Sequence, residues 1–266
     1  MAFRSLPARF FLLFLSLCLW PGHAASQAPA DSARLAAILQ RAADYCQRLD
    51  KAVMDFVCLE EVSETSHNLT PNTDVYLYDY QFVRKAGGGA KERRNLVSVN
   101  GKKADFRNTP LHTGFFQFQN VLFGPIGLLS RYWQAFLDYR IVAEEELDGQ
   151  KAMVVDAVPA SGFVEPHPYG RIWIREKDGA VLKIVWEQRS LGNFKIAEEW
   201  AKQHDSEPAI TSSSEYGFEK NGIRFPSRSR TEQAYTNKDR GKYVSAEISV
   251  AYRKYKFFQV ETETVF

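Results

Sequence analysis

The stretch at 169–189, YGRIWIREKDGAVLKIVWEQR, constrains the possible fold more than any other part of the chain. Two runs rich in apolar residues, Arg171–Arg175 and Val181–Glu187, flank Lys177-Asp178-Gly179. An Asp-Gly pair between two such runs is a strong hairpin signal, because both residues readily adopt the backbone conformations of tight turns. We therefore predict a β-hairpin here, at the middle of a large antiparallel sheet.

The hydrophobic pattern favours one register for this hairpin. A three-residue turn with a left-handed Gly179 pairs Ile172 with Ile184 and Ile174 with Leu182. A two-residue turn would instead place both isoleucines of the first run beside a lysine. The three-residue turn is therefore preferred, and it leaves a second face formed by Trp173, Arg175 and Lys183.

The beginning of the chain has the pattern of a secretory signal peptide, which we assign to residues 1–24. Arg4 and Arg9 precede an apolar core at 10–20, and Gly22-His23-Ala24 has the composition of a cleavage site. No later stretch has the roughly 18 consecutive apolar residues that a membrane-spanning helix needs. We expect a periplasmic or secreted protein without a transmembrane segment after cleavage; an uncleaved anchor is the alternative.

The charge balance of the rest of the chain excludes some classes of function. The whole chain has 34 basic and 32 acidic residues, and Arg4 and Arg9 leave with the signal peptide, so that the remainder has 32 of each. A nucleic-acid-binding protein normally has a basic excess or stripe, and none is evident. No linker rich in Pro, Gly or Ser divides this remainder. We expect a short tail at 25–30 and one domain at 31–266.

Two cysteines remain after cleavage, Cys46 and Cys58. An even pair in an oxidising compartment favours a disulfide, which would join the first helix to the first strand. Two buried free thiols are the alternative. A metal site is less favoured, because no His or further Cys lies nearby at ligand spacing, and we predict none.

One long helix and many strands are expected. Apolar residues at three- and four-residue steps predict a helix from Asp31 to Phe56. Four Asn-Gly or Asp-Gly turns separate strands without intervening helices, which is typical of an antiparallel meander. The expected strands are Val57–Thr65, Val75–Arg84, Lys91–Val99, Tyr139–Glu146, Lys151–Val158, Arg171–Arg175, Val181–Glu187, Lys195–Trp200, Ile210–Phe218, Arg228–Tyr235, Tyr243–Tyr252 and Phe257–Thr264.

The segment at 107–139 interrupts this regularity. Pro125 precedes an amphipathic stretch with Leu128, Leu129, Tyr132, Trp133 and Phe136 on one helical face. So much apolar surface between strands must cover something. It either plugs the core or forms a lid over a cavity.

A catalytic constellation is not evident. The sequence has no HExxH spacing and no Gly-x-Ser-x-Gly elbow, and no cofactor motif stands out. Two carboxylate runs, Glu144–Glu146 and Glu198–Glu199, are candidates for acid–base work, but such runs usually form solvated faces. His112 and His167 lie in expected loops. Enzymatic activity is therefore not predicted.

Aromatic residues are the most conspicuous part of the composition, with 19 Phe, 12 Tyr and 5 Trp. Tyr76, Tyr78, Tyr80 and Phe82 share one face of an expected strand, while the opposite face is also partly apolar. A sheet that is apolar on both faces needs cover on both sides or holds a ligand. Core packing and a ligand-holding concavity remain equally open on this pattern.

The run Ile172-Trp173-Ile174, followed by Asp178-Gly179 and Val181-Leu182-Lys183-Ile184, resembles the strand pair of the periplasmic lipoprotein-sorting carriers of the LolA and LolB type. The order of one amphipathic helix and a long meander interrupted by apolar helices is also similar. The resemblance implies a half-open β-barrel that holds acyl chains on a concave face beneath a helical lid. The chain differs in its greater length, its cysteine pair and its large insertion.

We therefore predict an α+β fold, in which a strongly curved antiparallel half-barrel wraps around the N-terminal helix beneath a helical, lid-like insertion at 125–137. The expected function is a non-enzymatic carrier or sensor for lipoprotein acyl chains or another apolar ligand. A structural or protein-interaction component of the envelope is the second hypothesis, and a hydrolase with an unrecognised site is the third. The predicted ligand-lining residues are Tyr78, Tyr80, Trp133, Phe136, Trp173 and Trp186.

Overall fold

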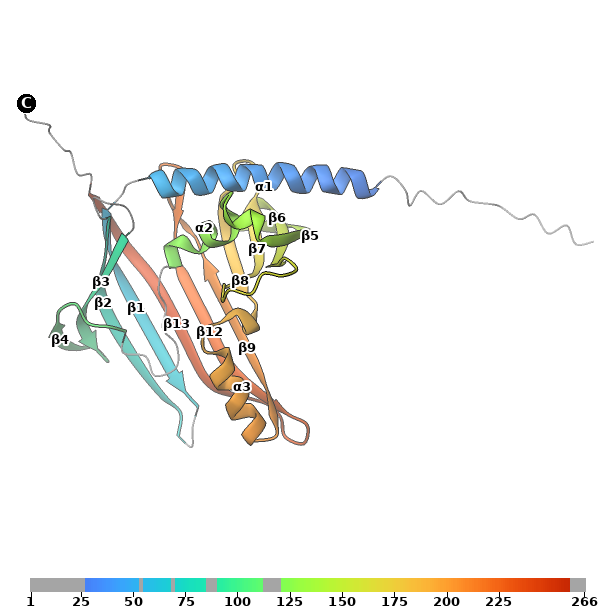
Figure 1. The fold of residues 1–266 in the computed structure, drawn as a ribbon. Coiled ribbons are helices and arrows are strands. Elements are labelled where there is room, and N and C mark those ends of the chain that lie inside the picture. The colour runs from blue at the N-terminus through green and yellow to red at the C-terminus, as the bar shows by residue number, and fades with distance from the viewer. Residues whose placement is uncertain (1–26, 53–54, 68–69, 85–89, 112–120, 259–266) are drawn as a thin grey trace, which may run out of the picture.

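The computed structural model describes residues 27–52, 55–67, 70–84, 90–111 and 121–258 (Figure 1). The predicted signal peptide at 1–24 and His112 lie outside these residues. The helices and strands, with η for a 3-10 helix, are α1 Gln27–Lys51, β1 Asp55–Ser66, β2 Asn72–Arg84, β3 Ala90–Val99, β4 Lys102–Phe106, η1 Val121–Phe123, α2 Gly124–Leu129, η2 Trp133–Ala135, β5 Leu137–Leu147, β6 Gln150–Pro159, β7 Gly170–Arg175, β8 Val181–Trp186, η3 Gln188–Ser190, α3 Phe194–Gln203, β9 Ser206–Glu215, β10 Phe218–Lys220, β11 Ile223–Phe225, β12 Arg228–Asn237 and β13 Gly241–Phe258.

One large antiparallel sheet dominates the structure and confirms the α+β class. Its 11 strands follow the order β4-β3-β2-β1-β13-β12-β9-β8-β7-β6-β5, and β10 and β11 form a separate pair. The terminal strands β4 and β5 lie at opposite ends of this order, so the sheet is open. Helix α1 runs across one end of the strands (Figure 1). The expected wrapping of the sheet around this helix stays a prediction.

The hairpin β7–β8 has the predicted register over most of its length. Ile172 pairs with Ile184 and Trp173 with Lys183, and Gly179 is left-handed with φ 76°. Nearer the turn, Ile174 pairs with Val181 instead of Leu182, because the strand carries a bulge. The prediction that this hairpin lies at the middle of the sheet is wrong, since β12 takes the middle place in the strand order.

The side chain of Asp178 explains the longer turn. Its two carboxylate oxygens accept hydrogen bonds from Nε and Nη2 of Arg175 at 2.8 and 2.6 Å. The Ala180 N–H donates to the same carboxylate at 3.2 Å, and the Gly179 N–H donates to the Arg175 carbonyl at 2.9 Å. The bidentate ion pair between Arg175 and Asp178 favours a turn one residue longer than the predicted three-residue turn. The register therefore shifts within the hairpin, and Leu182 of β8 becomes the extra residue of the bulge.

The other Asx-Gly turns fold as the sequence predicts. Asn100-Gly101, Asp148-Gly149 and Asn221-Gly222 have positive φ at both positions, which is the conformation of type I′ hairpin turns. The last of these turns pairs Phe218 with Phe225, as well as the two charged neighbours, as predicted. Turn chemistry therefore fixes these registers locally.

Helix α1 has different bounds from those predicted. It begins at Gln27 rather than Asp31, so the expected tail at 25–30 is largely helical; Pro29 is tolerated because it lies in the first turn. At the other end the helix stops at Lys51, and Phe56 belongs to β1. Phe56 satisfies both the helical period and the alternation of the following strand, and the strand prevails because its neighbours Cys58 and Val62 are buried on the same face.

The predicted disulfide is wrong, because Cys46 and Cys58 are both free and buried. The thiol of Cys46 points from α1 toward α2 and donates to the Pro125 carbonyl at 3.3 Å. The thiol of Cys58 lies in β1 beside Tyr255. Burial raises the pKa of Cys46 to about 12, so this thiol has little tendency to form the thiolate that disulfide exchange requires.

Two further elements differ from the predicted strands. Residues 194–203 form helix α3 instead of a strand at 195–200, because Ala197 and Ala201 bury one helical face and Lys202 forms an i,i+4 ion pair with Glu198. The two predicted strands at 243–252 and 257–264 are joined in the single strand β13, which the structure describes as far as Phe258. The expected amphipathic helix at 125–137 is divided into α2 and η2.

Among the described helices, none is long and apolar enough to cross a membrane.

The close packing of the Gly179 turn against α1 gives a testable prediction. A Cβ added to Gly179 would lie 2.3 Å from the Arg41 carbonyl carbon, whereas a Cβ on Gly149, which is equally left-handed, would meet nothing within 4 Å. Gly149→Ala therefore reports backbone strain alone, about 1 kcal/mol. Gly179→Ala adds a backbone clash and is expected to lower the free energy of unfolding by at least about 2 kcal/mol more. Urea denaturation measures the difference, and equal losses would contradict this packing.

Candidate functional site

The inner face of the large sheet is the candidate site. On β2, Tyr78, Tyr80 and Phe82 alternate toward this face and are buried. Strands from both halves of the sheet contribute to the same cluster. Its buried members include Phe56, Val62, Leu96, Met153, Val155, Ile172, Ile174, Ile184, Ile210, Ile248, Val250 and Tyr252. One face of the open sheet is thus lined mainly by apolar and aromatic side chains, with a buried polar strip of Ser212, Ser214, Ser229 and Thr231 on the middle strands β9 and β12.

Phe56 is the centre of an aromatic group on this face. Its ring stacks on Phe82 at 5.2 Å between centroids and meets Phe225 edge-on at 5.6 Å. Tyr255 lies 5.3 Å away on the long strand β13. These rings come from β1, β2, β11 and β13, so the group joins the first strands of the chain to the last. Aromatic pairs of this kind prefer particular ring orientations, so they favour one packing arrangement in addition to burying apolar area.

An ion pair lies within this apolar wall. Two nitrogens of the Arg94 guanidinium, Nε and Nη2, donate to the Glu60 carboxylate at 2.6 and 3.0 Å. Glu60 has no exposed surface, and the Arg94 guanidinium also lies 4.8 Å from the centre of the Tyr80 ring. Burial raises the pKa of Glu60, while the hydrogen bonds and charge of Arg94 act in the opposite direction. The pair is the buried ion pair of this face, which also carries the neutral polar pair Ser212–Thr231 at 2.8 Å.

A small cavity adjoins the ion pair. Its volume is about 10 Å³, enough for about one water molecule. The walls are Phe56, Tyr80, Glu92, Arg94, Val121, Leu122, Pro226, Tyr252 and Tyr255. Two of these residues, Val121 and Leu122, belong to η1 and cover the wall from the side opposite the sheet. At this place the inner face is therefore closed.

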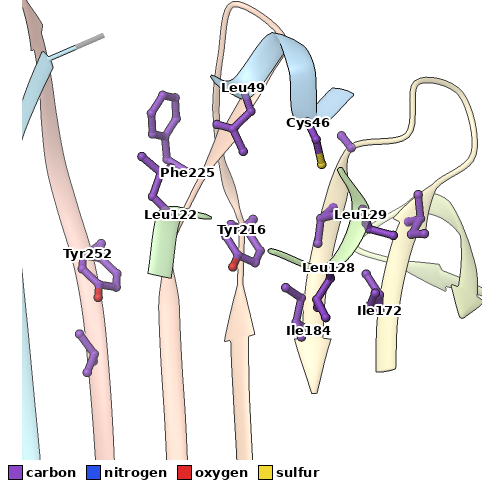
Figure 2. Packing of buried hydrophobic residues seen from close by; sticks show 14 of the residues in the cluster. Cys46, Leu49, Leu122, Leu128, Leu129, Ile172, Ile184, Tyr216, Phe225 and Tyr252 are labelled. Atoms are coloured by element: carbon purple, nitrogen blue, oxygen red, sulfur yellow. The ribbon is translucent and has the colours of Figure 1, made fainter. Parts of the chain in front are cut away.

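The insertion at 121–136, which we call the cover, packs on the inner face through apolar side chains. Figure 2 shows Leu122 beside Phe225, and Leu128 beside Ile184. The first helical residue, Gly124, fits tightly, because a Cβ there would lie 2.6 Å from the Tyr216 hydroxyl and 3.2 Å from the Trp186 ring. The Tyr216 hydroxyl itself donates to the Val121 carbonyl at 2.8 Å. Apolar contacts thus dominate this interface.

Helix α1 holds the cover from its other side. Cys46 and Leu49 project from α1 toward the cover and the sheet in Figure 2. Gln134 donates to the Leu39 carbonyl at 2.9 Å, and Arg131 pairs with Asp44 at 2.9 Å on the surface. The cover is therefore clamped between α1 and the sheet without joining any ladder of the sheet.

A second aromatic group closes the outer end of the cover. Trp133 stacks on His167 with 3.8 Å between ring centroids, and Phe163 meets both rings edge-on. Nε2 of His167 lies 2.7 Å from the Gly127 carbonyl oxygen, which is the geometry of an imidazole N–H donating to a carbonyl. Phe136 also contacts this group. The loop between β6 and β7 thus fastens the cover.

The six predicted lining residues fall in three places. Tyr78, Tyr80 and Trp186 lie on the inner face, and the Trp186 indole donates to Ser214 at 3.2 Å. Trp133 and Phe136 lie at the outer end of the cover. Trp173 lies on the opposite face of the sheet, where its indole donates to Glu145 at 2.7 Å and Lys183 lies 5.0 Å from its ring. The structure does not bring all six together.

Sequence reasoning missed Glu60, Arg94, Tyr216 and Tyr252. Glu60 has a signal in the sequence, since it alternates with Cys58 and Val62 and so occupies a buried position of β1. A charged residue at a strand position whose alternating neighbours are apolar is expected to be buried and to have a buried partner. The partner Arg94 could not be identified from the sequence. It lies in a run of charged residues at 91–94, and a bulge in the pairing of β2 with β3 changes which of them faces Glu60.

Metal and acid–base chemistry find little support in the described residues. Within the described ranges, no group of three or more His, Cys, Asp or Glu side chains is arranged to hold a metal ion. The run Glu144–Glu146 is exposed on β5, and Glu199 is exposed on α3. Glu198 forms an ion pair with Lys202. These carboxylates therefore lie on solvated faces.

Comparisons with known proteins find matches among solved structures. No protein-family model and no curated protein matches the chain. Among solved structures, it is similar to a domain described as an outer membrane lipoprotein-sorting protein from Vibrio parahaemolyticus, with 12% identity, a TM-score of 0.44, and 85% of this chain and 94% of that chain covered. A LolA superfamily protein from Nitrosomonas europaea has 12% identity and a TM-score of 0.38, with 84% and 94% covered.

A DUF1329 family protein from Desulfovibrio piger is similar to the same degree, with 12% identity, a TM-score of 0.38, and 85% and 95% covered. Similarities at this level carry no argument about what this chain binds.

The buried ion pair yields a prediction about stability. Arg94→Met leaves Glu60 buried without its partner and is expected to lower the free energy of unfolding by about 3–5 kcal/mol. The double variant with Glu60→Met removes both charges and is expected to recover most of that loss. Urea denaturation of the wild type, both single variants and the double variant measures the coupling. A double variant no more stable than Arg94→Met would contradict a desolvated pair.

Proposed function

We propose that the protein is an exported, non-enzymatic binding protein that holds an acyl chain or another apolar ligand against the inner face of its sheet. One observation carries this proposal: an aromatic and aliphatic wall is covered by a segment that contributes no strand to the sheet. The cover can therefore leave the wall without breaking a single ladder hydrogen bond of the sheet. A ligand would take the place of Leu122, Leu128 and Leu129.

The energetics suit a reversible exchange. Burying one CH₂ group contributes about 0.8 kcal/mol, so that ten methylenes contribute about 8 kcal/mol. Displacing three buried leucines costs about 1.5–3 kcal/mol for each side chain that becomes exposed. The gain is therefore of the same size as the loss of these leucine contacts, and opening also breaks the hydrogen bonds that Tyr216, Tyr139 and His167 make to carbonyls of the cover. An acyl chain can thus compete with the cover, and the protein can release the chain again when the cover returns.

The proposed roles of individual residues follow from their positions. Tyr78, Tyr80 and Trp186 would line the bound chain, and Trp133 and Phe136 would hold the outer end of the cover in the unliganded state. Trp173, on the opposite face, would not touch this ligand. A role as carrier or sensor in the periplasm rests on the signal-peptide pattern at 1–24 and on the resemblance to lipoprotein-sorting carriers.

The cover provides the test. Gly124→Ala would push the cover away from Tyr216 and Trp186, whereas Gly127→Ala adds a Cβ at an ordinary contact distance of 3.6 Å from His167. Both changes replace a glycine of the same short helix by alanine. We expect Gly124→Ala to take up a fluorescent C16 fatty acid at least threefold faster than wild type, and Gly127→Ala to match wild type. Stopped-flow fluorescence measures the rates. Absence of uptake in all three proteins, or three equal rates, would contradict the proposal.

The position of the bound chain is checked with brominated palmitate, whose bromines quench tryptophan at short range. Trp186→Phe should remove most of the quenching, and Trp173→Phe, which changes the same residue type on the opposite face, should leave it unchanged. Quenching lost only in Trp173→Phe would place the chain on the outer face instead.

A further inference from the structure

Strand β5 offers a free edge that differs from the other end of the sheet. It is the last strand beside β6 and has no strand on its outer side among the described residues. The opposite terminal strand, β4, has five residues with two lysines, and short lysine-bearing edge strands resist further pairing. β5 has 11 residues, with Tyr139, Ile141, Val142 and Ala143 in its apolar half. Its backbone is the more available one.

Helix α1 forms a roof over this edge. Figure 1 shows the N-terminal part of α1 extending past β5. Between helix and strand lies a groove of about 500 Å³, which is within the range of ligand-binding clefts. The groove is lined by Asp31, Ser32, Leu35 and residues 139–144 of β5. A strand added to β5 would therefore occupy this groove and be covered by α1 on one side.

The charges around the groove are mainly acidic. Glu144, Glu145 and Glu146 are exposed, and Asp31 lines the roof. Arg34 pairs with both Asp31 and Glu144, and Arg140 pairs with Asp156 at 3.1 Å, so the acidic excess comes from Glu145 and Glu146. A partner that brings positive charge to this end of β5 would be favoured over an acidic one.

The bulge at Val142 limits the length of any pairing. The register between β5 and β6 shifts between Ile141 and Ala143, which interrupts the regular ladder in the middle of the strand. Bulges of this kind discourage long, non-specific pairing between sheets. A short extended segment remains compatible with this edge, whereas the flat edge of another sheet does not.

We propose that an extended, basic segment of a partner protein adds to β5 as a further strand beneath α1, with its basic residues opposite Glu144–Glu146. The site lies at the edge of the sheet beside the cover, and the Tyr139 hydroxyl links the two by donating to the Leu128 carbonyl. Main-chain hydrogen bonds supply the affinity of such strand addition, and the acidic run and the groove supply the selectivity.

The probe is a fluorescein-labelled synthetic peptide with alternating Val and Thr and three Lys at one end, compared with the same peptide carrying Glu in place of Lys. We expect the basic peptide to bind at least tenfold more tightly by fluorescence anisotropy and to protect amides of 137–147 from hydrogen exchange. Equal affinity for both peptides, or protection confined to other strands, would overturn the proposal.

Two variants localise the effect. Glu146→Lys should weaken the basic peptide at least fivefold, while Glu207→Lys, the same charge change on β9, should have less than a twofold effect. Ser32→Trp fills the groove and should abolish binding, whereas Ala37→Trp, on another side of α1, should not. Concentration-dependent protection of 137–147 without peptide, together with a dimer in sedimentation, would overturn the peptide assignment in favour of a second copy of this chain.

Discussion

The contact between the Gly179 turn and the backbone of α1 sets how closely the helix lies to the hairpin β7–β8, and the cover packs between this helix and the sheet. Because Gly179 has no side chain, the hairpin can approach Arg41 and Ala42 at backbone distance. The Arg48 guanidinium donates to the Asp178 carbonyl at 3.2 Å, and the Arg224 N–H donates to the Tyr45 hydroxyl at 3.1 Å. The helix is thus held across the strand ends by two different hairpins, and it in turn supports the cover.

This arrangement explains why an open sheet can keep an apolar inner face. A closed barrel covers its interior by pairing its own edges, but here the terminal strands β4 and β5 stay apart in the strand order. The inner face is covered instead by the segment at 121–136, clamped between the sheet and α1. Since the cover is outside the ladders, the inner face and the sheet have separable stabilities. The buried pair Glu60–Arg94 places one demanding polar contact within this wall, where loss of either partner is costly.

Local chemistry in the sequence predicted local structure well. The Asx-Gly turns fixed the register at Asn221-Gly222, and alternation placed Ile172 and Trp173 on opposite faces of the sheet. The same alternation placed Tyr78 and Tyr80 together on one face. Contacts between distant segments were harder. The place of the hairpin β7–β8 in the strand order depends on β13 pairing with β1, which no local pattern encodes.

The errors have physical causes of the same kind. The stretch at 194–203 was predicted as a strand over only part of its length. The buried residues Ala197 and Ala201 are four positions apart, which is the spacing of one face of a helix. The expected disulfide rested on compartment and even count, while the geometry directs Cys46 to Pro125 and Cys58 to Tyr255. Part of the candidate site could be predicted from the sequence. The shared face of the aromatic residues on β2 follows from their alternation, but the Glu60–Arg94 ion pair depends on the bulge between β2 and β3, which the sequence pattern does not reveal.

The central claim is that the inner face binds an acyl chain. Native mass spectrometry of protein purified without detergent tests it most directly, because the mass of the intact protein includes any bound lipid. The account predicts a population heavier than the polypeptide by the mass of an acyl lipid, lost on delipidation and restored by incubation with palmitate. A bare polypeptide mass before delipidation and after incubation with palmitate would contradict a ligand-binding inner face.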